Sequence, residues 1–294
     1  MNLHNYQAFL AVYETQSFTK AAQKLFITQP TISKRVAALE TLLGKPLFNR
    51  IERKVTLNEA GRALLPIARD INLNIIESQR VINDIDGEIR GSLKLIASHH
   101  IGIHHLPLPL NALINAHPKL HIDLAFMDSE STCHEIECAN YELAMITLPP
   151  KVSKAIKILK SWPDPLVLAV GKTHPLLHNG TIELSDLSQY PATLPERDTY
   201  TRELIERNFL QKMISLKIGL ETNYLETIRS MVQIGLGWSI LPKTMINKSL
   251  QHIHIQDTQW QRELGIICHT QRSLSNAALG FIKEIEKLSQ FNTS

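Results

Sequence analysis

The chain has little cysteine: Cys133, Cys138 and Cys268 are its three, and no C-x-x-C motif occurs among its 294 residues. So sparse and odd a set excludes a disulfide framework and indicates a reducing compartment. Apolar runs near the ~20 residues of a membrane helix are also missing. The N-terminus has neither a basic start nor a small-residue cleavage site, which excludes a signal peptide. These absences predict a cytoplasmic protein that has no membrane partner.

The modest positive charge lies almost wholly near the N-terminus. The net charge is +3. Residues 1–90 contain 12 Lys or Arg and 9 Asp or Glu, whereas the remaining 204 residues contain 19 of each. Residues 17–54 contain eight basic side chains against Glu40 and Glu52. A short basic block of this kind is typical of a nucleic-acid-binding module.

Apolar spacing predicts three helices within the first 45 residues. The first covers residues 3–14, and the second follows Ser17, a good N-cap. The third starts at Thr28, which can also cap, and stops at Gly44. The core stripe of the third helix is Ile32, Val36, Leu39 and Leu43.

The second and third of these helices, joined by FITQ, form a helix-turn-helix pattern. In that motif the second helix enters the major groove, and its first residues meet bases and phosphates. The following segment, NRIERKVTL, predicts two short strands around a basic tip, which is a wing on the DNA backbone or minor groove. An ordinary basic surface helix would explain any one feature but not the whole series. We expect DNA contacts from Thr28, Gln29, Pro30, Thr31, Ser33, Lys34, Arg35, Arg50, Arg53 and Lys54.

A long helix is predicted after the wing. Two interleaved series recur every seven residues, Leu64, Ile71, Ser78, Ile85 and Ala68, Ile75, Ile82, Ile89. Such a seam of about four repeats is typical of a two-stranded coiled coil, and Pro66 should kink the helix or leave the Arg62 carbonyl unpaired. Packing of the stripe on the chain's own core is the alternative. We expect dimerisation through Leu64, Ile71, Ile75, Ile82 and Ile85.

The C-terminal two hundred residues alternate strand-like and helical patterns. The apolar runs are SLKLIAS, HIDLAF, ELAMIT, PLVLAVG, KIGLET, GWSILP and LGIICHT. Helical patterns lie between them near residues 101–116, 130–140, 199–213, 224–235 and 274–290. This alternation predicts an α/β fold with largely parallel sheets.

The run SFTKAAQKLFITQPTISKRVAALETLLGKPLFNR, followed by VTLNEAG, resembles the winged helix-turn-helix of LysR-type transcriptional regulators. Asn58 stands where that family usually has Thr, and Asn caps a helix equally well. The resemblance implies a homodimer or homotetramer that binds double-stranded promoter DNA, contacts RNA polymerase and responds to a small cytoplasmic metabolite. It implies a DNA-binding domain at 1–58, a linker helix at 59–90 and an effector domain at 91–294.

The same resemblance implies that the effector domain is periplasmic-binding-protein-like, with two Rossmann-like subdomains around a ligand cleft. We place subdomain I at 92–162 plus 267–294, and subdomain II at 163–266. In α/β sheets, ligands bind beyond the carboxyl ends of strands, where helix N-termini favour an organic anion. The predicted effector contacts are therefore Ser98, His99, His100, Asp128, Ser129, Thr147, Tyr200, Thr201 and Thr222, with Thr199, Glu221 and Asn223 as further candidates. For each residue, a capping or solvated role is the alternative.

The stretch SHHIGIHH raises the question of a metal. His100 and His104 are four residues apart, so a helix would place them on one face. No Glu or Cys nearby in the sequence completes a ligand set, and the spacing of Cys133, His134 and Cys138 is too irregular for zinc. We expect His104 and His105 to pack or cap at the surface. The sequence thus predicts no metal and no cofactor, with a metal-responsive regulator using His99–His105 as an alternative.

Catalytic motifs are also missing: no G-x-S-x-G, P-loop, G-x-G-x-x-G or H-E-x-x-H occurs. We therefore expect no enzyme. A catalytic α/β domain fused to a DNA anchor stays open as an alternative, and a free binding protein is disfavoured by the N-terminal DNA module.

Overall fold

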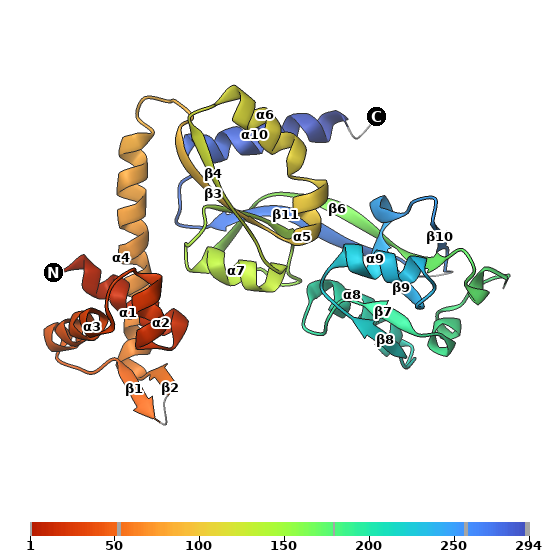
Figure 1. Cartoon of the computed structure of the whole chain (residues 1–294), viewed down its shortest axis with the longest axis horizontal. Helices are drawn as coiled ribbons and strands as arrows, with labels where there is room; N and C mark the ends of the chain where they lie inside the picture. Colours follow the sequence, from red (N-terminus) through yellow and green to blue (C-terminus); the bar gives the residue numbers. More distant parts are fainter. Residues whose placement is uncertain (1, 52–53, 179, 256–257, 292–294) are drawn as a thin grey trace. The chain divides into compact units, whose positions relative to one another are not determined.

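The computed structural model describes residues 2–51, 54–178, 180–255 and 258–291. It divides into two compact units, Met1–Asp86 and Gly87–Ser294 (Figure 1). None of the described helices is both long and apolar enough to cross a bilayer.

The N-terminal unit begins with three helices and a hairpin. Ser17 caps α2 by accepting a hydrogen bond from the Lys20 N–H, and Gly44 ends α3 with a φ of 70°. Ile32, Val36 and Leu39 are fully buried, whereas Leu43 is 41% exposed, so its assignment to the core was wrong. The α3 helix ends at Leu43. The elements are α1 (Leu3–Thr15), α2 (Phe18–Lys24), α3 (Gln29–Leu43), β1 (Phe48–Ile51) and β2 (Lys54–Leu57).

The long helix is shorter than its heptad pattern predicts. Asn58 caps α4 (Glu59–Asn83) by accepting from the Gly61 N–H at 2.9 Å, and its amide donates to the Pro46 carbonyl. Pro66 lies inside the helix.

The two ends of the predicted seam differ from the expected coiled coil. Leu64, Ala68 and Ile71 pack into the N-terminal unit's own core, as in the alternative interpretation. Ile85 lies beyond the end of α4, and Ile89 packs on the core of the C-terminal unit. The prediction of a four-repeat seam was therefore wrong at both ends. Apolar spacing alone cannot distinguish side chains that pack on a partner helix from side chains that pack on the chain's own core.

The C-terminal unit is built on a nine-stranded sheet within the described residues, in the order β4-β3-β5-β11-β6-β9-β7-β8, with β10 beside β6. The strands are β3 (Gly91–Ala97), β4 (Leu120–Phe126), β5 (Leu143–Thr147), β6 (Ile156–Gly171), β7 (Ala192–Leu194), β8 (Ile218–Glu221), β9 (Trp238–Pro242), β10 (Leu250–Ile253) and β11 (Trp260–His269). The helices are α5 (His99–His104), α6 (Pro107–Ala116), α7 (Ser129–Glu137), α8 (Tyr200–Gln211), α9 (Leu225–Gln233) and α10 (Asn276–Phe291). Short 3₁₀ turns are η1 (Pro175–His178), η2 (Leu184–Gln189) and η3 (Lys243–Met245).

This unit has two lobes with separate cores. The first lobe, with β3, β4, β5, α5, α6, α7 and α10, is centred on residues such as Leu95 and Phe281. The second lobe, with β7, β8, β9, α8 and α9, is centred on residues such as Trp238 and Phe209. Both contain parallel pairs, as predicted: β3 with β4 and β5, and β7 with β8 and β9.

Two long strands cross from one lobe to the other, β6 and β11 (Figure 1). They pair antiparallel with each other, and β11 with β5 and β6 with β9 are antiparallel too. The prediction of a largely parallel sheet was therefore wrong for the centre of the sheet. The stretch SWPDP, with two prolines and a charge, hid the first half of β6, because such residues are rare within strands.

Candidate functional site

The start of α3 presents polar side chains to solvent. Thr28, Gln29, Pro30 and Lys34 are exposed, and Thr31, Ser33 and Arg35 are partly exposed. The Thr28 and Thr31 hydroxyls are hydrogen-bonded at 2.8 Å, and the Gln29 amide donates to the Ser33 hydroxyl at 3.1 Å. Thr28 stands at the N-cap but makes no side-chain cap hydrogen bond, unlike its predicted capping role. Amide, hydroxyl and ammonium groups therefore share one exposed helix end.

The predicted wing is a two-stranded antiparallel hairpin, with Phe48 opposite Leu57 and Ile51 opposite Lys54. Arg50 lies on β1 and Lys54 begins β2, at the end of the hairpin farthest from α4. Arg53, at the predicted tip, lies outside the described residues.

In the C-terminal unit, a cavity of about 380 Å³ lies where the lobes meet. Its walls come from the ends of β3, β4 and β5 and from the starts of α5, α7, α8 and α9. Seven of the nine predicted effector contacts line it: Ser98, His99, His100, Asp128, Ser129, Thr147 and Thr201. Thr199 and Asn223 line it too. Strand ends and helix starts thus converge on one polar cavity. This agrees with the rule that ligands of α/β sheets bind beyond the carboxyl ends of the strands.

Two predicted effector contacts are not among the residues around this cavity. The Tyr200 backbone N–H donates to Glu130, its hydroxyl donates to the Cys133 sulfur at 3.8 Å, and its ring packs in a core of the first lobe. Burial raises the pKa of the Tyr200 hydroxyl. Thr222 is bound through its N–H to the Leu194 carbonyl. Glu221, a further candidate, pairs with Arg202 instead.

Arg262 is a cavity residue that the sequence did not reveal. Its Nε donates to Asp164 Oδ2 at 2.8 Å, and its Nη1 donates to the Thr201 hydroxyl at 2.9 Å. Arg262 and Asp164 face each other across β11 and β6, and both are buried. A guanidinium has five N–H donors, and these contacts use two. A cation therefore lies at the wall of the cavity, and its partner is 98 residues away in the sequence.

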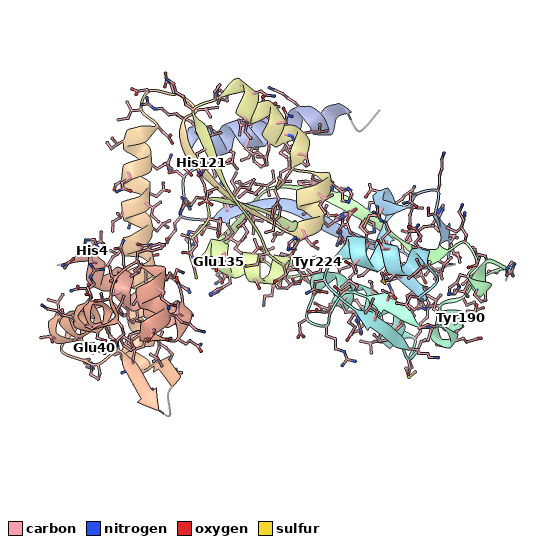
Figure 2. The ribbon with its side chains drawn as sticks, viewed as in Figure 1. His4, Glu40, His121, Glu135, Tyr190 and Tyr224 are labelled. Carbon is pink, nitrogen blue, oxygen red and sulfur yellow. The ribbon has the colours of Figure 1, made fainter. Side chains whose placement is uncertain are left out.

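Aromatic rings form another part of the cavity wall. The His99 ring stacks on Phe126, with centroids 5.7 Å apart, and meets the edge of Tyr224 at 4.9 Å. Gly102 makes this possible, because a Cβ there would come within 2.1 Å of the Phe126 ring. Tyr224, labelled in Figure 2, belongs to the second lobe, so His99 contacts both lobes.

His100 and His104 meet a carboxylate from the other lobe. His100 Nδ1 lies 3.2 Å and His104 Nε2 lies 3.1 Å from the same Oε1 of Glu226, in the first turn of α9. Among the described residues, these three are the one group of three or more His, Cys, Asp or Glu side chains whose possible metal-ligand atoms all lie within 4.8 Å of one another. No Glu or Cys lies near these histidines in the sequence; the carboxylate that joins them in space, Glu226, lies 122 residues beyond His104.

The pKa values of His100, Glu226 and the neighbouring His105 are lowered from their ordinary values. Burial lowers the pKa of His100, so its ring is neutral near pH 7. Burial, with the neighbouring His100 adding to it, lowers the pKa of His105 to about 4. For Glu226, burial acts to raise the pKa, but hydrogen bonds from His100, the backbone and His104 outweigh it and lower the pKa to about 2. Glu226 is thus a carboxylate facing two imidazoles.

The second cysteine–histidine cluster is less organised. Cys133 and Cys138 are both buried, and only Cys138 approaches His134, with 3.6 Å between Sγ and Nε2. Burial raises the pKa of Cys133 to about 11, which disfavours the thiolate that metals bind.

Comparison with known proteins places both units. Residues 3–62 match the family model of the bacterial regulatory helix-turn-helix protein of the lysR family, and residues 86–289 match that of the LysR substrate binding domain. The HTH-type transcriptional activator CmpR of Synechocystis sp. is 30% identical over 285 residues, which cover 95% of this chain and 93% of that protein.

Solved structures agree in fold. A full-length OxyR variant from Pseudomonas aeruginosa has a TM-score of 0.65 at 21% identity, over 99% of this chain and 94% of that one. The effector binding domain of QuiR in complex with shikimate has a TM-score of 0.60 at 19% identity, over 69% of this chain and 98% of that one. The predicted fold class, a winged helix-turn-helix and long helix followed by an α/β effector domain, is confirmed.

Proposed function

Because the chain belongs to the LysR family of bacterial transcriptional regulators, we propose that it binds promoter DNA as a two-fold oligomer whose binding is modulated by a small organic anion. The observation that carries the proposal is the polar cavity between the lobes, lined by side chains of both and by Arg262.

The DNA contacts belong to the start of α3 and to the wing. Hydroxyl, amide and ammonium groups of Thr28, Gln29 and Lys34 are exposed at the first turns of the helix that enters the major groove in this motif. Thr31, Ser33 and Arg35 follow on the same helix, and Arg50, Arg53 and Lys54 would reach phosphates. Such phosphate contacts make affinity fall with salt concentration.

The linker helix joins two chains in this proposal, which keeps domains at 1–58, 59–90 and 91–294. Exposed apolar side chains at the end of α4 and just beyond it support this role: Val81 is 51%, Ile82 68% and Ile85 71% exposed. A two-fold dimer reads two half-sites about one helical turn apart, or a multiple of that. Pairing of effector domains would extend the dimer to a tetramer.

The effector is an organic anion of metabolite size. A cavity of about 380 Å³ lies within the roughly 300–1,000 Å³ of small-molecule sites. Arg262, the hydroxyls of Ser98 and Thr147, and the backbone N–H groups at the starts of α7 and α8 can bind a carboxylate. Shikimate, the ligand in the related QuiR structure, is an organic carboxylate. Closure of the lobes around such an anion would change the geometry of the oligomer on DNA.

The remaining expectations follow from this role. Contact with RNA polymerase and a cytoplasmic location are those of a regulator that meets promoter DNA. The relatives are regulators rather than enzymes, and the proposed response requires ligand binding without turnover.

The test measures ligand and DNA binding on the same full-length protein. Carboxylate metabolites are screened by thermal shift, and DNA affinity is measured by fluorescence anisotropy on a site selected from random sequence. A ligand at 100 times its Kd should stabilise the fold by ~2.7 kcal/mol. Ser98→Ala should lose this shift, because Ser98 lines the cavity. The variant should keep its fold and its DNA binding, because the Ser98 hydroxyl makes no cap hydrogen bond that α5 would lose. Lys34→Ala should keep the shift and lose specific DNA binding by ~1–3 kcal/mol.

Two results would contradict the proposal. If no carboxylate shifts the melting temperature, the effector is not an organic anion. If Lys34→Ala weakens random and selected DNA equally, Lys34 contacts phosphate only.

A further inference from the structure

We propose that His100, His104 and Glu226 bind a divalent transition-metal ion of the Zn²⁺ type, which fastens α5 of the first lobe to α9 of the second. The ion is proposed as a clamp between the lobes and not as the signal that the regulator senses. This metal site goes beyond the proposed function, since neither DNA binding nor binding of an organic effector requires a metal.

The ligand spacing fits such an ion. His100 and His104 occupy positions i and i+4 of α5, so both rings leave the same face, and their centroids are 4.6 Å apart. Zn²⁺ binds histidine nitrogens and carboxylate oxygens at about 2.0–2.2 Å, which separates tetrahedral ligand atoms by about 3.4 Å. The two observed separations from Glu226 Oε1, 3.2 and 3.1 Å, are already close to that value. A small adjustment of three side chains would place the three ligand atoms at three corners of a tetrahedron and leave the fourth corner open.

The donor set is also the right kind. Two imidazoles and one carboxylate are a ligand set known for zinc with one coordination position left open. The Glu226 carboxylate supplies one negative charge, which offsets part of the ion's positive charge. An ordinary histidine–carboxylate hydrogen-bond group is the competing explanation. His100 Nε2 is buried without a hydrogen-bond partner under either explanation, so metal titration is the measurement that separates them.

The site has a path to solvent. The His104 and Glu226 side chains are 33% and 25% exposed, whereas that of His100 is 6% exposed. An ion can therefore enter from the His104 side and reach His100 Nδ1. His100 also lines the cavity, so the ion would lie at its edge.

The consequence is mechanical. Glu226 lies in the first turn of α9, whose residues Leu225, Ile228 and Val232 are buried in the second lobe. His100 follows β3, which is central to the first lobe. An ion bound to both would restrict lobe movement more than two hydrogen bonds to one oxygen.

The experiment titrates the full-length protein, freed of metal with a chelator, with Co²⁺ alone and then Zn²⁺ alone. One ion per chain should bind, and Co²⁺ should give the visible absorption bands of a four-coordinate ion. Glu226→Gln and His104→Gln keep similar shapes and should each weaken Zn²⁺ binding by at least ~10–100-fold in competition with a coloured chelator. His121→Gln is the matched control, because His121 is an exposed histidine on β4 outside the group (Figure 2). Its affinity should equal that of the unmodified protein.

Two outcomes would overturn the proposal: less than one ion per chain, or an affinity that Glu226→Gln and His104→Gln leave unchanged. The group is then a hydrogen-bonded latch only. Circular dichroism verifies that the variants fold, and the partly exposed His104 provides a variant with little effect on the core. Because metal affinity is measured without DNA or effector, its failure would leave the proposed regulatory function untouched, and the converse holds too.

Discussion

At the residue scale, His174 shows how burial sets a pH response. Its Nδ1 accepts the Leu176 N–H at 3.3 Å, and its ring meets the edge of Tyr190 with centroids 4.9 Å apart. An accepting Nδ1 cannot carry a proton. Burial lowers the pKa of His174 below its ordinary value of 6.5, which agrees with that geometry.

We therefore predict that His174 makes the folded state less stable in acid. Below pH 6.5 the unfolded chain binds a proton at this residue that the folded chain does not, so the free energy of unfolding falls as pH falls. His174→Asn keeps an acceptor for Leu176 and cannot titrate. Urea unfolding at about pH 7.5 and about pH 5.5, on either side of the ordinary histidine pKa, should show a smaller loss for this variant than for the unmodified protein.

A matched variant separates this effect from the rest of the chain. His121→Asn, at an exposed histidine, should keep the pH dependence of the unmodified protein. An equal loss in His174→Asn and the unmodified protein would contradict the assignment.

At the residue scale, the position of a side chain at the cavity was predictable from sequence where the rule was local. Ser98, Asp128 and Thr147 are placed at the cavity by the strand or helix beside them, and the order of residues along the chain reveals that. Arg262 and Glu226 act through partners 98 to 126 residues away, and no local pattern encodes such a pair. Their contribution to binding stays a prediction until it is tested.

At the element scale, α4 combines two tasks that one apolar pattern cannot separate. Its first half packs into the N-terminal core through Leu64, Ala68 and Ile71. Toward its end, Arg80 bonds Glu77 and Asp84 along the helix while Val81 and Ile82 stay exposed. In the proposed dimer, this exposed end is the part available to a partner chain.

We predict that Ile82→Asp weakens the proposed dimer. Ile82 is 68% exposed, so it buries little apolar surface within its own chain, whereas a charge at an apolar helix–helix contact costs desolvation in both chains. Sedimentation velocity should show a larger monomer fraction at equal concentration, with an unchanged far-ultraviolet dichroism spectrum. Asn72→Asp adds the same charge about a quarter-turn away from the seam of α4 and should leave the dimer intact. A dimer that survives Ile82→Asp would place dimerisation elsewhere.

Elements were predictable to the extent that their patterns were uninterrupted. Each of the seven apolar runs became part of a strand, since alternation and β-branched residues favour the pleated backbone. The first half of β6 was missed because Pro163 and Pro165 interrupt the run. Both prolines belong to a strand that pairs with β11, where Pro163 faces Glu263 and Pro165 faces Gln261.

At the scale of the whole molecule, β6 and β11 run through both lobes. They form ten register pairs, and the buried Arg262–Asp164 ion pair lies within them, at the wall of the cavity. The proposed anion would meet Arg262 of this pair and both lobes at once. Ligand binding and lobe arrangement would then be linked through the same residues.

We predict that this linkage is reciprocal. If the organic anion changes the affinity for DNA by some factor, DNA must change the affinity for the anion by the same factor, because both describe one thermodynamic cycle. Typical coupling of about 1–3 kcal/mol corresponds to roughly 5–150-fold. Calorimetry of the anion with DNA-free and DNA-saturated protein, beside anisotropy of DNA with and without the anion, measures both factors. Ser98→Ala, with its ligand affinity lowered but its lobes unchanged, should retain the equality. Unequal factors would mean that the anion binds a state of the protein outside this cycle, such as a different oligomer.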